Sequence, residues 1–416
     1  MKQRIVLTLA VFCALCVTAA GLLAIPGPVP DPKYTILHNL QDQPLEGSGS
    51  TCQQMATDGS KLYGMTTTGG ANNRGSIFST NIDGTGYAQL FSFSGPDGAD
   101  PQGAPVLSGT KLYGVTTFGG TTNGGVIWSM NTDGTGFSLV YDFGLDPADP
   151  AFPVGTPILD NGRIYCMAQQ NPQWPVSYKG AIFSVKTDGT GFQLLHGFTG
   201  GVDDGQYPMG SLTLSGTKFY GMASEGGDSN RGVVFSMNKD GSAYTVIHEF
   251  AGGVNDGNNP YSSVLVSGSK LYGMTPTGGD SDLGVVFSMN TDGTGFTLMH
   301  EFAGGVNDGS SPYGGLALRN GKLYGTTQFG GDADSGVLFS IATDGTGFAL
   351  VHEFVSVAGS DGFWPNAETP ILSGSYLYGI TQAGGNAGAG VIWRYEVGAV
   401  IPPAPVVPKC FINTLM

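Results

Sequence analysis

Residues 270–302 read KLYGMTPTGGDSDLGVVFSMNTDGTGFTLMHEF, and the chain repeats this stretch along most of its length. Residues 218–250 read KFYGMASEGGDSNRGVVFSMNKDGSAYTVIHEF, and residues 322–354 read KLYGTTQFGGDADSGVLFSIATDGTGFALVHEF. A fixed period of this length is typical of repeat architectures, in which each copy forms one structural unit. The period therefore predicts the fold before any single residue is considered.

The tyrosine of the LYG-like segment marks each copy. Four short strands fit in each copy, because strands average about 5–6 residues. Glycine, at 70 of 416 residues, is too frequent for a helical protein. We expect an all-β, seven-bladed β-propeller built of four-stranded blades. The marker occurs seven times, 50–55 residues apart, at Tyr63, Tyr113, Tyr165, Tyr220, Tyr272, Tyr324 and Tyr378.

Turn residues divide the loops between two faces of this propeller. Asp-Gly pairs stand between the third and fourth strands of six copies, where their positive φ angles suit a tight hairpin. Strand alternation places these hairpins on one face. The loops between the second and third strands, and the connections from one blade to the next, lie on the other face, which we call the loop face. The Asp-Gly turns begin at Asp83, Asp133, Asp188, Asp240, Asp292 and Asp344.

The two ends of the repeat region complete each other. Residues 34–40 match the fourth strand of the repeat, but the other three strands of a copy do not stand before them. The last copy stops after its third strand, near Val397. The 364 residues from Tyr34 to Val397 divide into seven units of 52. We expect the N-terminal strand to pair with residues 390–395 and so to close the ring in the last blade. Closure removes the strand edges that invite aggregation.

The segments outside the repeats predict export. Residues 1–24 carry Lys2 and Arg4 before an apolar run, as in a secretory signal peptide, and an uncleaved anchor is the alternative. Residues 25–33 form a Pro-rich lead-in, residues 34–397 the propeller, and residues 398–416 a Pro-rich tail. We expect a secreted or extracytoplasmic monomer whose mature domain does not insert into a membrane.

The charge composition disfavours one class of binding partner. Lys and Arg number 17 against 32 Asp and Glu, a formal net charge of −15, which argues against nucleic acid as a partner. After cleavage only Cys52, Cys166 and Cys410 remain, so no disulfide framework can be read from the sequence; one pair is possible, and one thiol is left over.

The motif LYG-x-T-x-x-GG, followed by G-V-V-F-S and DGTG-F-x-x-x-H-x-F, resembles the Gloeobacter–Verrucomicrobia ("GloVer") tandem-repeat family of exported bacterial proteins. The resemblance covers nearly all of residues 34–397. It implies propeller-like repeats and export, with varied C-terminal anchors and no established activity. This chain shows no recognisable anchor, and the resemblance supplies no catalytic residue.

The sequence contains few candidates for catalytic or metal-binding residues. All histidines share one repeat position on the fourth strand, so they are spread around the rim, whereas a metal ion needs its ligands around one point. We therefore predict a structural role for them and no metal site or cofactor. Calcium is an open alternative, because aspartates are frequent in loops such as GGDSDLG on the loop face. The histidines are His38, His196, His248, His300 and His352.

The loop residues that depart from the repeat are the candidate site. Trp174 and Tyr178 lie in an altered loop of the third copy, and Asp361, Phe363 and Trp364 lead into the seventh. Aromatic platforms with a few polar groups suit sugars and protein segments alike. The first hypothesis is a non-catalytic scaffold that binds a glycan or protein on the acidic loop face. The second is a polysaccharide lyase or hydrolase that uses carboxylates there. The tryptophans could also simply pack their own loops onto the scaffold.

Overall fold

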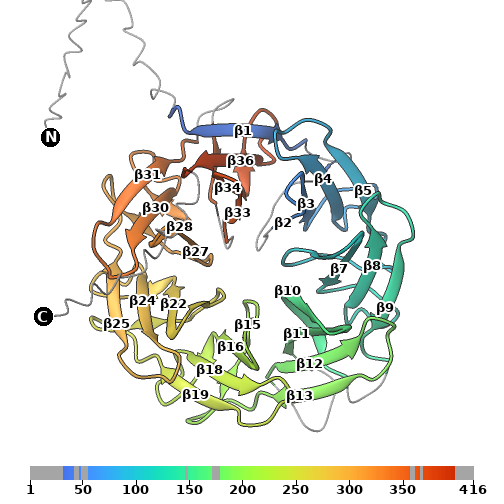
Figure 1. The fold of residues 1–416 in the computed structure, drawn as a ribbon, viewed down its shortest axis with the longest axis horizontal. Helices are drawn as coiled ribbons and strands as arrows, with labels where there is room; N and C mark the ends of the chain where they lie inside the picture. Colours follow the sequence, from blue (N-terminus) through green and yellow to red (C-terminus); the bar gives the residue numbers. More distant parts are fainter. Residues whose placement is uncertain are drawn as a thin grey trace, which may run out of the picture. The chain divides into compact units, whose positions relative to one another are not determined.

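The computed structural model describes residues 31–41, 46–47, 55–145, 149–170, 179–356, 361–365 and 369–398. The chain divides into two units, Met1–Pro32 and Lys33–Met416, and the strands all belong to the second. Seven four-stranded antiparallel sheets stand around a ring like the blades of a propeller (Figure 1). The predicted all-β, seven-bladed fold is therefore confirmed.

Each blade runs from an innermost strand near the ring centre to an outermost strand at the rim (Figure 1). Blades one to three contain β2 (Ala56–Thr57), β3 (Lys61–Thr66), β4 (Ser76–Asn81) and β5 (Ala88–Ser92); β6 (Val106–Ser108), β7 (Lys111–Thr116), β8 (Val126–Asn131) and β9 (Ser138–Asp142); and β10 (Ala151–Asp160), β11 (Arg163–Gln170), β12 (Ala181–Lys186) and β13 (Gln193–Gly197). Blades four to seven contain β15 (Thr213–Ser215), β16 (Lys218–Ala223), β18 (Val233–Asn238) and β19 (Thr245–Glu249); β21 (Leu265–Ser267), β22 (Lys270–Thr275), β24 (Val285–Asn290) and β25 (Thr297–Glu301); β27 (Ala317–Arg319), β28 (Lys322–Thr327), β30 (Val337–Ala342) and β31 (Ala349–Glu353); and β33 (Ile371–Ser373), β34 (Tyr376–Ile380), β36 (Val391–Glu396) and β1 (Tyr34–Asn39).

The seventh blade is made from both ends of the repeat region. Strand β1 pairs antiparallel with β36, from Tyr34 opposite Tyr395 to Asn39 opposite Val391. The register of this pair shifts at one residue, and the outer two strands of the other six blades show the same shift. This shared bulge identifies β1 as a fourth strand, and the predicted closure of the ring is confirmed.

The core consists of seven apolar clusters, each of which joins two neighbouring blades. In one of them Tyr272 and Met274 of blade five pack with Leu323 and Phe339 of blade six. The glycine of the LYG segment leaves room for the third-strand ring, because a Cβ atom on Gly273 would collide with Phe287. The marker tyrosine of each copy, like Tyr272, packs between its own blade and the next.

The two tryptophans that replace a third-strand phenylalanine follow the same packing. Trp128 and Trp393 are fully buried. Blade three has Cys166 where other blades have the LYG glycine, and its thiol donates to the Val154 carbonyl at 3.2 Å. Burial raises the pKa of this thiol to about 12, so it is an inert core group.

Several predicted segments fall outside the description. Residues 1–24, most of the lead-in at 25–33 and the tail from 399 to 416 lie beyond the described residues. Within the described ranges no helix is both long and apolar enough to cross a bilayer.

Candidate functional site

The loop face has secondary structure of its own. In blade four, β14 (Gly205–Gln206) in the incoming connection pairs with β17 (Glu225–Gly226) between the second and third strands. These pairs confirm that the two kinds of loop share one face. Three further blades repeat the arrangement, with β20 (Gly257–Asn258) on β23 (Thr277–Gly278), β26 (Gly309–Ser310) on β29 (Phe329–Gly330), and β32 (Gly362–Phe363) on β35 (Ala383–Gly384).

One backbone position on this face is left-handed in six blades. It is the residue before the proline that leads into each of blades two to seven, and we call it the pre-proline position. Neighbouring loops impose its shape, since Tyr207 N donates to the Lys179 carbonyl at 2.7 Å and Ser224 N donates to the Tyr207 carbonyl at 3.2 Å. The left-handed region costs most L-residues roughly 1–2 kcal/mol, and Asn and Asp tolerate it best. The position, with φ from 52° to 63°, is held by Asp100, Phe152, Tyr207, Asn259, Ser311 and Trp364.

Two of the candidate residues at blade seven lie together on the loop face. Trp364 is 36% exposed, and its ring meets Phe363 edge-on at 5.0 Å and Phe329 edge-on at 6.3 Å between centroids. Asp361 instead faces the rim, where its Oδ2 lies 3.0 Å from His352 Nε2. The third candidate therefore has a structural partner of its own. Trp174 and Tyr178 lie outside the described residues.

A second aromatic pair occupies the same place between blades two and three. Phe152 at the pre-proline position meets Phe118 at 5.3 Å and 60°. Phe118 is 36% exposed, and it holds the position in its blade that Phe329 holds in blade six. This pair is not among the sequence-predicted site residues.

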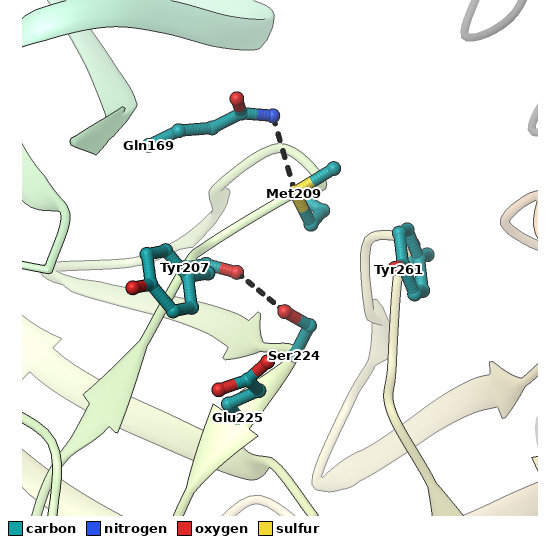
Figure 2. A pocket seen from close by; sticks show the side chains of 6 residues that line it. All are labelled: Gln169, Tyr207, Met209, Ser224, Glu225 and Tyr261. Atoms are coloured by element: carbon teal, nitrogen blue, oxygen red, sulfur yellow. Dashed lines mark hydrogen bonds between the residues drawn. The ribbon is translucent and has the colours of Figure 1, made fainter.

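The loop face is hollowed where blades three, four and five meet. The cavity measures about 270 Å³. Figure 2 shows Tyr261 across the opening from Met209 and Ser224, with Glu225 beside Ser224. The side chains that line it are Gln169, Tyr207, Met209, Ser224, Glu225 and Tyr261.

The polar groups of this cavity are only partly engaged with one another. Gln169 Nε2 donates to the thioether of Met209 at 3.1 Å, a weak acceptor. Ser224 Oγ donates to the Tyr207 carbonyl at 2.8 Å (Figure 2). Glu225 Oε2 accepts from the buried Gln206 amide at 2.6 Å. Glu225 is the only ionisable carboxylate among the six lining residues, and none of the six is Lys or Arg.

The rim histidines are tied into a different arrangement. His248 stacks on Phe296 of the next blade at 3.9 Å, and its Nε2 lies 3.1 Å from Asp256. His38, His196, His300 and His352 repeat this pattern with Glu46, Asp204, Asp308 and Asp361 and with the rings of Tyr87, Tyr244, Phe348 and Tyr34.

The loop aspartates that suggest calcium bind their own loops. Asp282 and Asp334 accept backbone N–H groups of Gly278 and Gly330 at 2.8 and 2.9 Å. Among the described residues, His, Cys, Asp and Glu side chains nowhere gather in a group of three that could hold a metal ion.

A family model, the Gloeobacter/Verrucomicrobia repeat, matches residues 28–216 and 160–393. The chain belongs to this repeat family. No curated protein matches the chain in sequence.

Solved structures similar to this repeat protein show the fold alone. An oligogalacturonate lyase in complex with manganese is 13% identical, with a TM-score of 0.52 over 87% of this chain and 92% of the lyase. A GH74 enzyme from Niastella koreensis is 14% identical, with a TM-score of 0.52 over 88% of this chain and 54% of that one. A puromycin hydrolase is 13% identical with the same TM-score, over 88% of this chain and 57% of the hydrolase.

Sequence reasoning missed the cavity, although a signal for it exists. Blades two to seven each have a proline at the same point of the incoming connection, and the residues on either side of it differ from copy to copy. Residues 207–209, 259–261 and 311–313 read YPM, NPY and SPY. Comparing copies at this position would have selected Tyr207, Met209 and Tyr261.

Proposed function

We propose that this protein is an exported, non-catalytic β-propeller scaffold that binds a glycan or a protein on its loop face. One observation carries the proposal. The pre-proline position keeps one left-handed backbone in six blades, yet Phe152, Tyr207 and Trp364 place large rings there.

The shared backbone does not require these rings. Asn259 occupies the same position at low conformational cost, and Ser311 occupies it with a small side chain. Trp364 is 36% exposed, and the part of its surface that faces solvent contributes little to folding. Exposed aromatic side chains on a rigid scaffold provide large contact area at low entropic cost, as binding sites require.

Catalysis has less support than binding. A lyase or hydrolase would need two converging carboxylates in one cleft. The cavity between blades three and five contributes a single carboxylate, Glu225, among its lining residues. Export rests on residues 1–24, and the net charge of −15 favours a partner other than nucleic acid.

The test compares Trp364→Asn with Ser311→Asn in the secreted form, residues 25–416. Both changes place a tolerant residue in the same left-handed backbone, so both variants should fold. We expect Trp364→Asn to weaken binding to a polysaccharide panel or to cell-envelope protein by about 2 kcal/mol or more, roughly 30-fold. Ser311→Asn should bind as the unmodified protein does. Equal binding by both folded variants would place the site elsewhere, and the absence of any binding by the unmodified protein would refute the proposal.

A further inference from the structure

The cavity at blades three to five is assembled from residues that the repeat does not require. Blade five has Thr277 where blade four has Glu225, and blade four has Met209 where blades five and six have Tyr261 and Tyr313. The backbone is the same in each case, since β17 and β23 pair alike with their incoming connections. The lining is therefore specific to this place in the ring.

We infer that this cavity binds one or two rings of a saccharide that carries no acidic group. The inference rests on the proposed function and names its ligand class. At about 270 Å³, the cavity is slightly smaller than the roughly 300–1,000 Å³ of pockets that enclose drug-sized ligands. That volume suits the end of an oligosaccharide and excludes the middle of a thick polymer bundle.

Aromatic side chains supply the apolar part of the site. Tyr261 is half-buried and is held edge-on by Tyr313, with ring centroids 5.4 Å apart and planes at 79°. Tyr207 enters from the neighbouring blade, on the far side of Met209 from Tyr261 (Figure 2). The C–H face of a pyranose can pack on such a ring, whereas its hydroxyls require polar neighbours.

The polar groups are placed to exchange partners with sugar hydroxyls. Gln169 Nε2 gives its hydrogen bond to the Met209 thioether, and a hydroxyl oxygen is a stronger acceptor. Glu225 uses Oε2 for Gln206, which orients the carboxylate at the cavity wall. A carboxylate accepts several hydrogen bonds, so Glu225 can still accept from a sugar hydroxyl or ammonium.

Charge decides against acidic sugars. The lining contains the carboxylate of Glu225 and no Lys or Arg. A uronate in this cavity would place a second negative charge near Glu225, and no lining residue carries a positive charge to offset it. The lining therefore favours neutral or amine-bearing saccharides and disfavours polyuronates.

The experiment is calorimetric titration of residues 25–416 with tetrasaccharides of three kinds: neutral gluco-, manno- and xylo-tetraoses, a chitosan tetramer, and tetragalacturonate. We expect at least one neutral or amine-bearing ligand to bind and tetragalacturonate to bind at least tenfold more weakly. Tyr261→Ala should weaken the preferred ligand at least tenfold. Glu225→Gln keeps the shape of the side chain but removes its charge. The ratio of the affinity for the preferred ligand to the affinity for tetragalacturonate should therefore fall at least threefold.

Tyr207→Asn separates binding from folding, because Asn suits the left-handed backbone while the ring is lost. It should fold as well as the unmodified protein and bind the ligand at least tenfold more weakly, whereas Ser311→Asn should leave affinity unchanged. Tight binding of tetragalacturonate, or a saccharide affinity that Tyr261→Ala and Tyr207→Asn leave unchanged, would overturn the inference. If no tetrasaccharide binds but the protein captures envelope protein through Trp364, this inference fails while the proposed function stands.

Discussion

The outer rim and the loop face use the same repeat in opposite ways. At the rim, the fourth-strand position that holds His248 in blade four is always His, Phe or Tyr. The side chain that it stacks on in the next blade is always Phe or Tyr. On the loop face, the pre-proline backbone is constant while its six described side chains are all different: Asp, Phe, Tyr, Asn, Ser and Trp. The constant rim is what folding requires, and the variable loop face is where we propose binding.

The rim stacks form a continuous belt around the ring. Phe91 and Tyr141 replace histidine in blades one and two, and they stack on Phe137 and Phe192 of the next blade at 3.8 and 5.2 Å. The belt ends where it began, because Tyr34 of β1 stacks on His352 of blade six at 3.8 Å. The strand that closes the last blade also closes the belt.

The largest effect should come from breaking this belt at β1. Deleting residues 25–41 removes the pairing with β36 and the Tyr34 stack, and it exposes the outer edge of β36. We expect loss of a single cooperative transition, or a fall of more than about 4 kcal/mol in the free energy of unfolding. Calorimetry and light scattering would measure the result. Deleting residues 400–416 is the control and should leave the melting curve unchanged, and an equally unchanged curve for the first deletion would contradict the composite blade.

A smaller effect should come from the acid of one rim unit, and it should depend on pH. Burial by itself would raise the pKa of Asp204, but hydrogen bonds from His196 and Thr199 outweigh it and hold the pKa below the ordinary value of 3.8. The ionised form of Asp204 is therefore more stable in the folded state than in the unfolded state. This stabilisation is present above about pH 4 and is lost as the pH falls further.

The variant Asp204→Asn tests whether the charge of Asp204 stabilises the fold above about pH 4. The variant keeps the size of the side chain but loses the charge that accepts four hydrogen bonds, from His196, from Gly205 and from both donors of Thr199. We expect a loss of about 2 kcal/mol at pH 6, measured by urea unfolding, and a gap that shrinks between pH 5 and pH 2.5. A gap that stays constant over this range would show that the charge of Asp204 does not stabilise the fold. Ligand affinity should not change, because the side chain of Asp204 faces His196 at the rim and does not line the cavity.

Sequence patterns predicted the elements that local chemistry controls. Asp292 accepts hydrogen bonds from Thr294 N and Oγ1 at 3.0 and 2.7 Å, as expected of an Asp-Gly hairpin. The period, the strand lengths and the orphan strand at Tyr34 were enough to give seven blades and their closure. These features depend on residues near in sequence or on counting copies.

Features that depend on contacts between blades could not be predicted in this way. A residue before proline is ordinarily extended, so the sequence alone favours that shape at Tyr207. The hydrogen bonds to Lys179 and Ser224 impose the left-handed backbone instead, and only the folded ring brings them together. The cavity follows from the same contacts. Trp174 and Tyr178 stay a prediction, because they lie outside the described residues.

The smallest predicted effect tests whether the pre-proline backbone is strained at all. Ser311 has φ of 56° and Asn259 has φ of 52° at the equivalent position of the neighbouring blade. Asn tolerates this region better than Ser, since its side chain can hydrogen-bond locally. Ser311→Asn should therefore raise the free energy of unfolding by about 0.5 kcal/mol.

Ser310→Asn is the matched control for this change. It also copies a residue of blade five, Asn258, but it stands in β26, where the backbone is extended. It should bring no gain in stability, so the difference between the two variants isolates the backbone effect from the effect of adding an amide. Thermal melts of both variants beside the unmodified protein would measure it. A gain in Ser310→Asn as large as in Ser311→Asn would mean that the left-handed position carries little strain, and the rings of Phe152, Tyr207 and Trp364 would then occupy it at no cost to folding.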